Sequence, residues 1–171
     1  MQKLISFILD KFIHLPFPIR IYSLIDLWSS NSQGLGWGGA GTIKEEIKAC
    51  LSLLKTKPNI FIDIGANKGL YTEGVVNKVA SIEAHIFEPS ELNYNILKDK
   101  FLFSNSIKIN KIALSNSNSK AKLYTDKPGS TIGSLTKRRL DHFDIEMNNE
   151  EEVDLIRFDE YWGKNNTIID Y

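Results

Sequence analysis

A glycine-rich turn with an acidic residue at its start is the part of this chain best suited to bind a nucleotide-like ligand. The turn, Asp63-Ile64-Gly65-Ala66-Asn67-Lys68-Gly69, follows the apolar run 60–62 and leads into a segment with helical spacing. Glycine lets the backbone approach a ligand closely, and the amides at a helix start bind anionic groups. A strand, this turn and a helix therefore predict a cofactor site at the carboxyl end of the strand.

The spacing of the turn indicates which cofactor it suits. It reads Asp-x-Gly-x-x-x-Gly rather than the Gly-x-Gly-x-x-Gly that holds the pyrophosphate of a dinucleotide. This difference favours S-adenosylmethionine, whose methionine carboxylate would meet the free amides and whose amino group would bond to Asp63. A tight turn without a ligand is the alternative reading.

A second acidic residue, Glu88, strengthens the prediction. It lies 25 residues after Asp63, directly after the strand-like stretch 82–87, and Pro89 follows it. An acid at the end of the second strand can accept hydrogen bonds from both hydroxyls of a ribose. Nicotinamide and flavin enzymes use the same device, so Glu88 alone does not distinguish among these cofactors.

Strands and helices alternate around these residues. The patterns predict strands at 60–64, 82–87 and 107–114, and helices at 70–79 and 89–101. This βαβαβ order is typical of a parallel sheet with right-handed crossovers and helices on both faces. The expected fold is therefore α/β and Rossmann-like.

The remaining sequence divides into less regular segments. Beyond the third strand we expect a short strand at 120–124, a polar and turn-rich stretch over 126–152, a helical turn at 158–162 and a strand that begins at 167. The chain stops at Tyr171, inside that expected strand, so we expect the sheet to be incomplete at its C-terminal side.

Residues 1–57 read as an N-terminal helical segment before the cofactor domain at 58–171. Prolines at 16 and 18 separate two amphipathic helices, and a Gly/Ser/Asn loop at 29–41 precedes a third helix. The first apolar stripe is too short to span a bilayer. We expect it to pack on its own domain in a cytoplasmic protein; peripheral membrane contact through residues 1–28 is the alternative.

Composition argues against several other classes of function. Lys and Arg total 21 and Asp and Glu total 21, so no net charge steers nucleic acid to the chain. The single cysteine, Cys50, has no partner for an internal disulfide, and the three histidines show no metal-ligand spacing. We therefore expect neither a nucleic-acid partner nor a metal site.

Several motifs resemble one family. The stretch from Phe61 to Thr72 is similar to the first motif of FkbM-type methyltransferases. The resemblance continues, in order, through residues 87–90, 93–97, 110–115, 130–135 and 155–161, and it covers about residues 58–171. It implies a class I methyltransferase sheet, S-adenosylmethionine as cofactor, and O-methylation of a small-molecule hydroxyl acceptor such as a sugar or glycan precursor.

The resemblance also implies roles for single residues. Asp63, Gly65, Asn67 and Gly69 would line the methionine end of the cofactor. Glu88 would hold the ribose, with Pro89 and Ser90 beside the adenosine. Ala113 or Leu114 would border the adenine, and residues 130–134 would lie near the acceptor entrance. The family continues with Lys-Ile-Asp-Val-Glu-Gly where this chain ends, which implies a truncated domain that is either active or an inactive fragment.

The catalytic base is not identified by the sequence. Asp141, His142 and Asp159 are candidates because a hydroxyl nucleophile needs a base within hydrogen-bond reach. Two other functions stay open: an NAD-dependent oxidoreductase, and a non-catalytic module for interaction or membrane contact. The Asn-Pro-Pro-Tyr type motif of nucleic-acid amino-methylating enzymes is missing from the sequence.

Overall fold

The computed structural model describes residues 29, 43–54, 56–79, 81–163 and 169. The chain divides into two compact units, Met1–Thr42 and Ile43–Tyr171. The helices predicted before residue 43 and the strand predicted from residue 167 lie outside the described residues. In the part of the chain that the structure describes, every helix is too short or too polar to cross a membrane.

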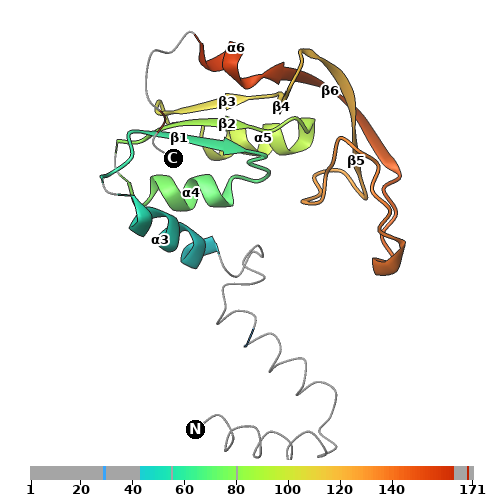
Figure 1. Cartoon of the computed structure of the whole chain (residues 1–171), viewed down its shortest axis with the longest axis horizontal. Helices are drawn as coiled ribbons and strands as arrows, with labels where there is room; N and C mark the ends of the chain where they lie inside the picture. Colours follow the sequence, from blue (N-terminus) through green and yellow to red (C-terminus); the bar gives the residue numbers. More distant parts are fainter. Residues whose placement is uncertain (1–28, 30–42, 55, 80, 164–168, 170–171) are drawn as a thin grey trace, which may run out of the picture. The chain divides into compact units, whose positions relative to one another are not determined.

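A parallel sheet forms the centre of the second unit (Figure 1). The order of elements is α3 (Ile43–Leu53), β1 (Ile60–Ile64), α4 (Leu70–Val76), β2 (Glu83–Phe87), α5 (Glu91–Lys100) and β3 (Ile107–Asn110). The three strands pair in the order β1-β2-β3, and both pairings are parallel. The predicted α/β class with a parallel sheet is therefore confirmed, while both helices are shorter than the sequence pattern indicated.

The two faces of this sheet bury different side chains, because successive strand residues point to opposite sides. Ala84 and Ile86 of β2 lie in an apolar core with Ile47 of α3, Val75 of α4 and Leu97 of α5. This face is therefore covered by the three helices. Burial of these apolar groups is the main source of stability for the unit.

The short helix α6 (Phe158–Trp162) covers part of the opposite face with aromatic side chains. The ring of His85 lies 4.9 Å from the ring of Trp162, and the ring of Phe87 lies 4.9 Å from that of Tyr161, both edge-on. The helical turn predicted at 158–162 is thus confirmed, and helices contact both faces of the sheet.

His85 is a buried titratable group within this aromatic contact. Its Nε2 lies 2.9 Å from Oε1 of Glu83, and its Nδ1 lies 2.8 Å from the hydroxyl of Tyr161. Because a carboxylate only accepts, Nε2 donates to Glu83, and Nδ1 of the neutral ring accepts from Tyr161. Burial lowers the pKa of His85, although the hydrogen bond to Glu83 opposes that effect; Lys108, which also bonds to Glu83, lowers the pKa further.

We expect His85 to make the fold sensitive to mild acid. Since its pKa is lower in the folded chain than in the unfolded chain, the unfolded chain binds the extra proton as pH falls below about 6.5. The free energy of unfolding should therefore drop between about pH 7 and 5, by up to about 1.4 kcal/mol per pH unit. In His85→Gln, which can still donate to Glu83 and accept from Tyr161, this part of the pH dependence should vanish. Denaturant unfolding at several pH values tests this, and parallel curves for the two proteins would contradict it.

A second sheet contains β4 (Ala113–Ser115), β5 (Ser119–Thr125) and β6 (Asn149–Arg157), in the order β4-β6-β5. The single strand predicted over 107–114 is wrong, because β3 ends at Asn110 and β4 belongs to this other sheet. The side-chain amide of Asn110 donates to the carbonyl of Ile86, 3.1 Å away. The same amide also donates to the carbonyl of Lys108, two residues earlier, at 3.3 Å. Such local side-chain bonds give the backbone an alternative to continuing the strand.

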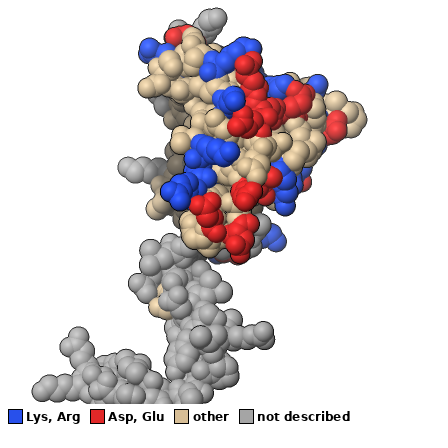
Figure 2. Space-filling view, turned by 90° about the vertical axis from the view of Figure 1, so that its right-hand side faces the viewer, with Lys and Arg blue, Asp and Glu red and all other residues tan. Residues whose placement is uncertain are grey.

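The predicted end of the turn-rich stretch, residue 152, is wrong, because β6 begins at Asn149. The 3-10 turn η1 (Asp141–Phe143) lies within this stretch. β6 pairs antiparallel with β5, and its acidic residues bond to lysines across the strands: Lys120 to Glu152 at 2.8 Å and Lys122 to Glu150 at 2.7 Å. Acidic and basic side chains are intermixed on the face shown in Figure 2.

Candidate functional site

The predicted site lies where β1 and β2 end. The amides of Gly65 and Ala66 donate to the carbonyl of Phe87, at 2.9 and 3.0 Å. The amide of Glu88 donates to the carbonyl of Asn110, at 3.0 Å. These bonds join the first residues after β1 and β2 to the last residue of the neighbouring strand, β2 or β3, so the two turns are held together at one edge of the sheet.

The carboxylate of Glu88 lies at the centre of this edge and is 5% exposed. Its Oε2 accepts a hydrogen bond from the amide of Asn67 at 2.8 Å, and its Oε1 accepts one from the amide of Ser90 at 2.9 Å. Burial raises the pKa of Glu88, and these two bonds together with the nearby side-chain amide of Asn93 oppose that rise.

The bonds to Glu88 limit what else it can hold. An ionised carboxylate has about four acceptor positions. The backbone amides of Asn67 and Ser90 occupy two of them. About two positions therefore remain for a ligand, as many as the two ribose hydroxyls that the sequence analysis assigned to this residue.

Asn67 connects the first turn to a distant loop. Its φ angle is +50°, in the left-handed region that asparagine tolerates better than most residues. Its side-chain Nδ2 donates to the carbonyl of Ser130 at 3.0 Å. The hydroxyl oxygen of Ser130 in turn accepts from the amide of Ile132 at 3.1 Å. The loop after β5 thus forms a wall facing the turns after β1 and β2.

These segments enclose a cavity of about 120 Å³. It is lined by Gly65, Asn67, Glu88, Pro89, Ser90, Asn93, Leu123, Thr125, Ser130, Thr131 and Gly133. Five of the residues that the sequence analysis placed around the cofactor are therefore brought together: Gly65, Asn67, Glu88, Pro89 and Ser90. Drug-sized ligands occupy pockets of about 300–1,000 Å³, so this cavity can enclose one part of a nucleoside cofactor while the rest lies outside it.

The two glycines of the first turn have different surroundings. A Cβ built on Gly65 would meet no atom within 4 Å, although its φ of +79° disfavours other residues. A Cβ on Gly69 would lie 2.6 Å from Cδ2 of Leu97 and 2.9 Å from Cε2 of Phe101. Gly65 thus leaves open space at the cavity, whereas Gly69 permits close packing of the turn against α5.

Asp63 and Ala113 do not line the cavity. Asp63 accepts a hydrogen bond from the hydroxyl of Thr72 in α4. Burial raises the pKa of Asp63, and the bond from Thr72 opposes this. Ala113 pairs with Leu155 in the second sheet. Both residues therefore contact other parts of the fold. The roles that the sequence analysis assigned to them in cofactor binding stay predictions.

Sequence reasoning did not assign Asn93 to the site. Asn93 lies on α5 and is 1% exposed, with its Oδ1 lacking any hydrogen-bond partner. It precedes the buried Leu97 by one helical turn, so it occupies the apolar face of the helix. The sequence does contain a sign of this role: an asparagine lies on the apolar face of a helix, and buried polar groups need partners.

A neighbouring cavity of about 340 Å³ shares Ser90 and Thr125 with the first. Its other lining residues include Glu91, Asn95 and Asn149. Among the described residues, its lining contains carboxylates, amides and hydroxyls and no lysine or arginine. This composition suits a neutral ligand with several hydroxyl groups.

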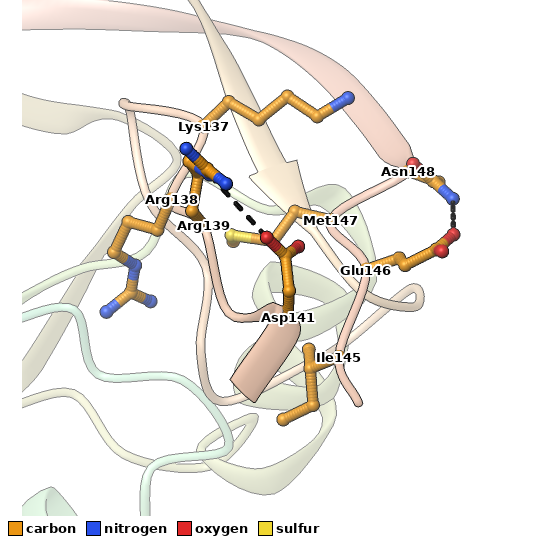
Figure 3. A pocket seen from close by; sticks show the side chains of 8 residues that line it. All are labelled: Lys137, Arg138, Arg139, Asp141, Ile145, Glu146, Met147 and Asn148. Carbon is orange, nitrogen blue, oxygen red and sulfur yellow. Dashed lines mark hydrogen bonds and ion pairs between the residues drawn. The ribbon is translucent and has the colours of Figure 1, made fainter. Parts of the chain in front are cut away.

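A cavity of about 440 Å³ lies elsewhere, beside η1 (Figure 3). Lys137, Arg138 and Arg139 line it, but their charged ends point in different directions. Arg138 bonds to the carbonyl of Ile132, and the side chain of Arg139 is 93% exposed near Asp141. The three cations therefore do not converge on one ligand position.

The three candidate bases do not lie in the Glu88 cavity. Asp141 lines the cavity of Figure 3, and His142 follows it in η1. Asp159 is exposed and forms an ion pair with Arg157. Among the described residues, no group of three or more side chains could hold a metal ion.

Comparison with known proteins adds little to this picture. No protein-family model matches the chain, and no similar curated protein was found. Among solved structures, the FkbM methyltransferase of Methylobacillus flagellatus KT aligns at 15% sequence identity with a TM-score of 0.41. The alignment covers 64% of this chain and 24% of that one, so the chain spans about a quarter of that enzyme's length. This similarity does not establish membership of the family.

Proposed function

We propose that residues 43–171 form a cofactor-binding unit for S-adenosylmethionine, with the ribose in the Glu88 cavity and the methionine end above Gly65. The observation that carries this proposal is the buried Glu88 carboxylate with an open acceptor position beside the unobstructed Gly65 turn. When bound, S-adenosylmethionine supplies a sulfonium-activated methyl group for transfer to a nucleophilic atom.

The residues of this chain would contribute binding and orientation. Glu88 would accept a hydrogen bond from the ribose, and the backbone at Gly65 would lie against the amino-acid part. The amides of Gly65 and Ala66 are already bonded to Phe87, so they do not serve as anion donors. The acceptor would be a neutral small molecule with hydroxyl groups, such as a sugar, in the adjoining cavity with its carboxylates and amides.

A thermal unfolding experiment tests the cofactor proposal. S-adenosylhomocysteine, the product form, should raise the unfolding temperature of the full chain, since a ligand at 100 times its dissociation constant adds about 2.7 kcal/mol of stability. NAD at the same concentration should give a smaller shift, because the turn lacks the pyrophosphate-binding spacing.

The outcomes separate the competing functions. A larger shift with NAD would favour an oxidoreductase. A cooperative transition that neither compound moves would contradict the proposal and favour a non-catalytic module.

A further inference from the structure

We propose that residues 126–133, in the loop after β5, form a lid over both cavities beside Glu88, and that the side chain of Asn67 is its latch. The hydrogen bond from Asn67 to Ser130 holds the lid closed, and it must break when a ligand enters or leaves. The gating of the cofactor rests on the proposed function, whereas the latch rests on contacts within the chain. Asn67 is then a positioning residue rather than the direct cofactor contact that the resemblance implies.

The lid has a closed base. The amide of Tyr124 donates to the carbonyl of Ser134 at 2.8 Å, and the amide of Ser134 donates to the carbonyl of Tyr124 at 3.0 Å. The chain therefore leaves β5 and returns to the same point after a short excursion. Compact loops whose ends are joined in this way are frequently functional. The lid can swing about this base while β5 stays paired with β6.

The lid forms a wall of both cavities. Three of its residues line the Glu88 cavity and two line the neighbouring cavity, namely Ser130, Thr131 and Gly133, and Pro128 and Gly129. The Glu88 cavity has a volume of about 120 Å³, below the ~300 Å³ of the smaller pockets that enclose drug-sized ligands. A nucleoside cofactor therefore enters more deeply when this wall moves, and the same movement opens the neighbouring cavity.

Little apolar packing holds the lid in place. Ile132 is its one branched aliphatic side chain, and it is only half-buried. Gly129, with a φ of +69°, brings the backbone close to the start of α5, because a Cβ there would lie 2.9 Å from Cδ2 of Leu92. Arg138, which follows the lid, donates to the carbonyl of Ile132. Segments with few buried apolar contacts open at a low cost in free energy, so polar bonds decide whether this lid is closed.

The latch joins the lid to the centre of the site. Nδ2 of Asn67 donates to the carbonyl of Ser130 at 3.0 Å, and the backbone amide of Asn67 donates to Oε2 of Glu88 at 2.8 Å. One residue thus connects the lid to the buried carboxylate. A hydrogen bond between neutral groups shifts an equilibrium by about two- to tenfold. This bond favours the closed lid and still breaks readily enough for a ligand to pass.

Hydrogen exchange of the full chain without ligand, followed by mass spectrometry, tests the latch. Asn67→Gly removes the donating side chain, keeps the backbone amide and suits the φ of +50°. Exchange over residues 126–134 should become about two- to tenfold faster, while β2 and β6 stay unchanged. Asn116→Gly is the matched control, because Asn116 is exposed between β4 and β5 and contacts Ser115. It should exchange as the parent does.

A second variant keeps the test decisive if Asn67→Gly does not fold. Asn67→Asp retains the size of the side chain and the tolerance of a left-handed φ, but its carboxylate cannot donate to the carbonyl of Ser130. It should speed exchange over the same residues. Exchange over 126–134 that is unchanged in the folded variant would overturn the latch, whether or not the chain binds a cofactor.

Binding kinetics with S-adenosylhomocysteine test the gating. Because the latch opposes both entry and release, Asn67→Gly should raise the association and dissociation rate constants by a similar factor of about two to ten. The dissociation constant should stay within about threefold of the parent value. Loss of a direct ligand contact would instead raise the dissociation rate and leave the association rate unchanged.

The failures are distinguishable. A faster dissociation with an unchanged association would make Asn67 a ligand contact, so the gating would be wrong and the cofactor proposal would stand. If the parent does not bind S-adenosylhomocysteine, the proposed function and the gating of its ligand both fail. Faster exchange over residues 126–134 in Asn67→Gly would then still support the latch.

Discussion

Replacing Gly69 with alanine is expected to destabilise the second unit by about 2–5 kcal/mol. Part of the loss comes from the backbone, because a φ of +71° is unfavourable for a residue with a Cβ. The rest comes from overpacking, because the new Cβ would lie 2.6 Å from Leu97 and 2.9 Å from Phe101. Denaturant unfolding of the two proteins measures the difference.

Gly65→Ala provides the matched control. It has the same kind of backbone cost, with a φ of +79°, but no atom lies within 4 Å of the added Cβ. It should therefore cost only about 1–2 kcal/mol. Its methyl group would instead occupy the open space at the cavity and weaken binding of S-adenosylhomocysteine. Equal destabilisation by the two substitutions would contradict the packing role assigned to Gly69.

Glu88→Ala is expected to lower stability by about 2–6 kcal/mol, because it removes the acceptor of two backbone amides. The amides of Asn67 and Ser90 both donate to this carboxylate, at 2.8 and 2.9 Å. Each buried donor left without a partner costs about 1–3 kcal/mol. The same variant should show no thermal shift with S-adenosylhomocysteine.

Glu73→Gln is the control for the loss of a carboxylate. Glu73 lies on α4, its side chain is 46% exposed, and it pairs with Lys100 at 2.9 Å. Exposed pairs of this kind contribute about 0.2–1 kcal/mol, so this variant should remain close to the parent in stability and should keep the ligand shift. A Glu88→Ala protein as stable as Glu73→Gln would show that Glu88 does not organise the two turns.

Local sequence patterns were sufficient for the elements that carry the site. The strand patterns before Asp63 and Glu88 predicted β1 and β2, and the helical spacing between and after them predicted α4 and α5. Periodicity of this kind records which side chains face a core. It therefore located both turns and placed Glu88 at the end of the second strand.

Features that depend on packing between distant segments were not predictable in this way. The pattern of the stretch 107–114, which predicts one strand, does not show that Ala113 pairs in a different sheet from Ile107. The steric reason for Gly69 requires the position of Leu97 on another helix. Asn93 is visible as a polar residue on an apolar face, but its link to Glu88 requires the packing of α5 against the strand ends.

The bond between Asn67 and Ser130 joins residues 63 positions apart in the chain. Closing so long a loop costs chain entropy before any contact repays it, whereas the β1-α4-β2 segment forms from nearby contacts. The turn should therefore take shape early in folding, and the cavity only when the loop after β5 docks onto it. A chain halted between these steps would present the binding motif without a binding site, so ligand affinity would report completion of the final folding step.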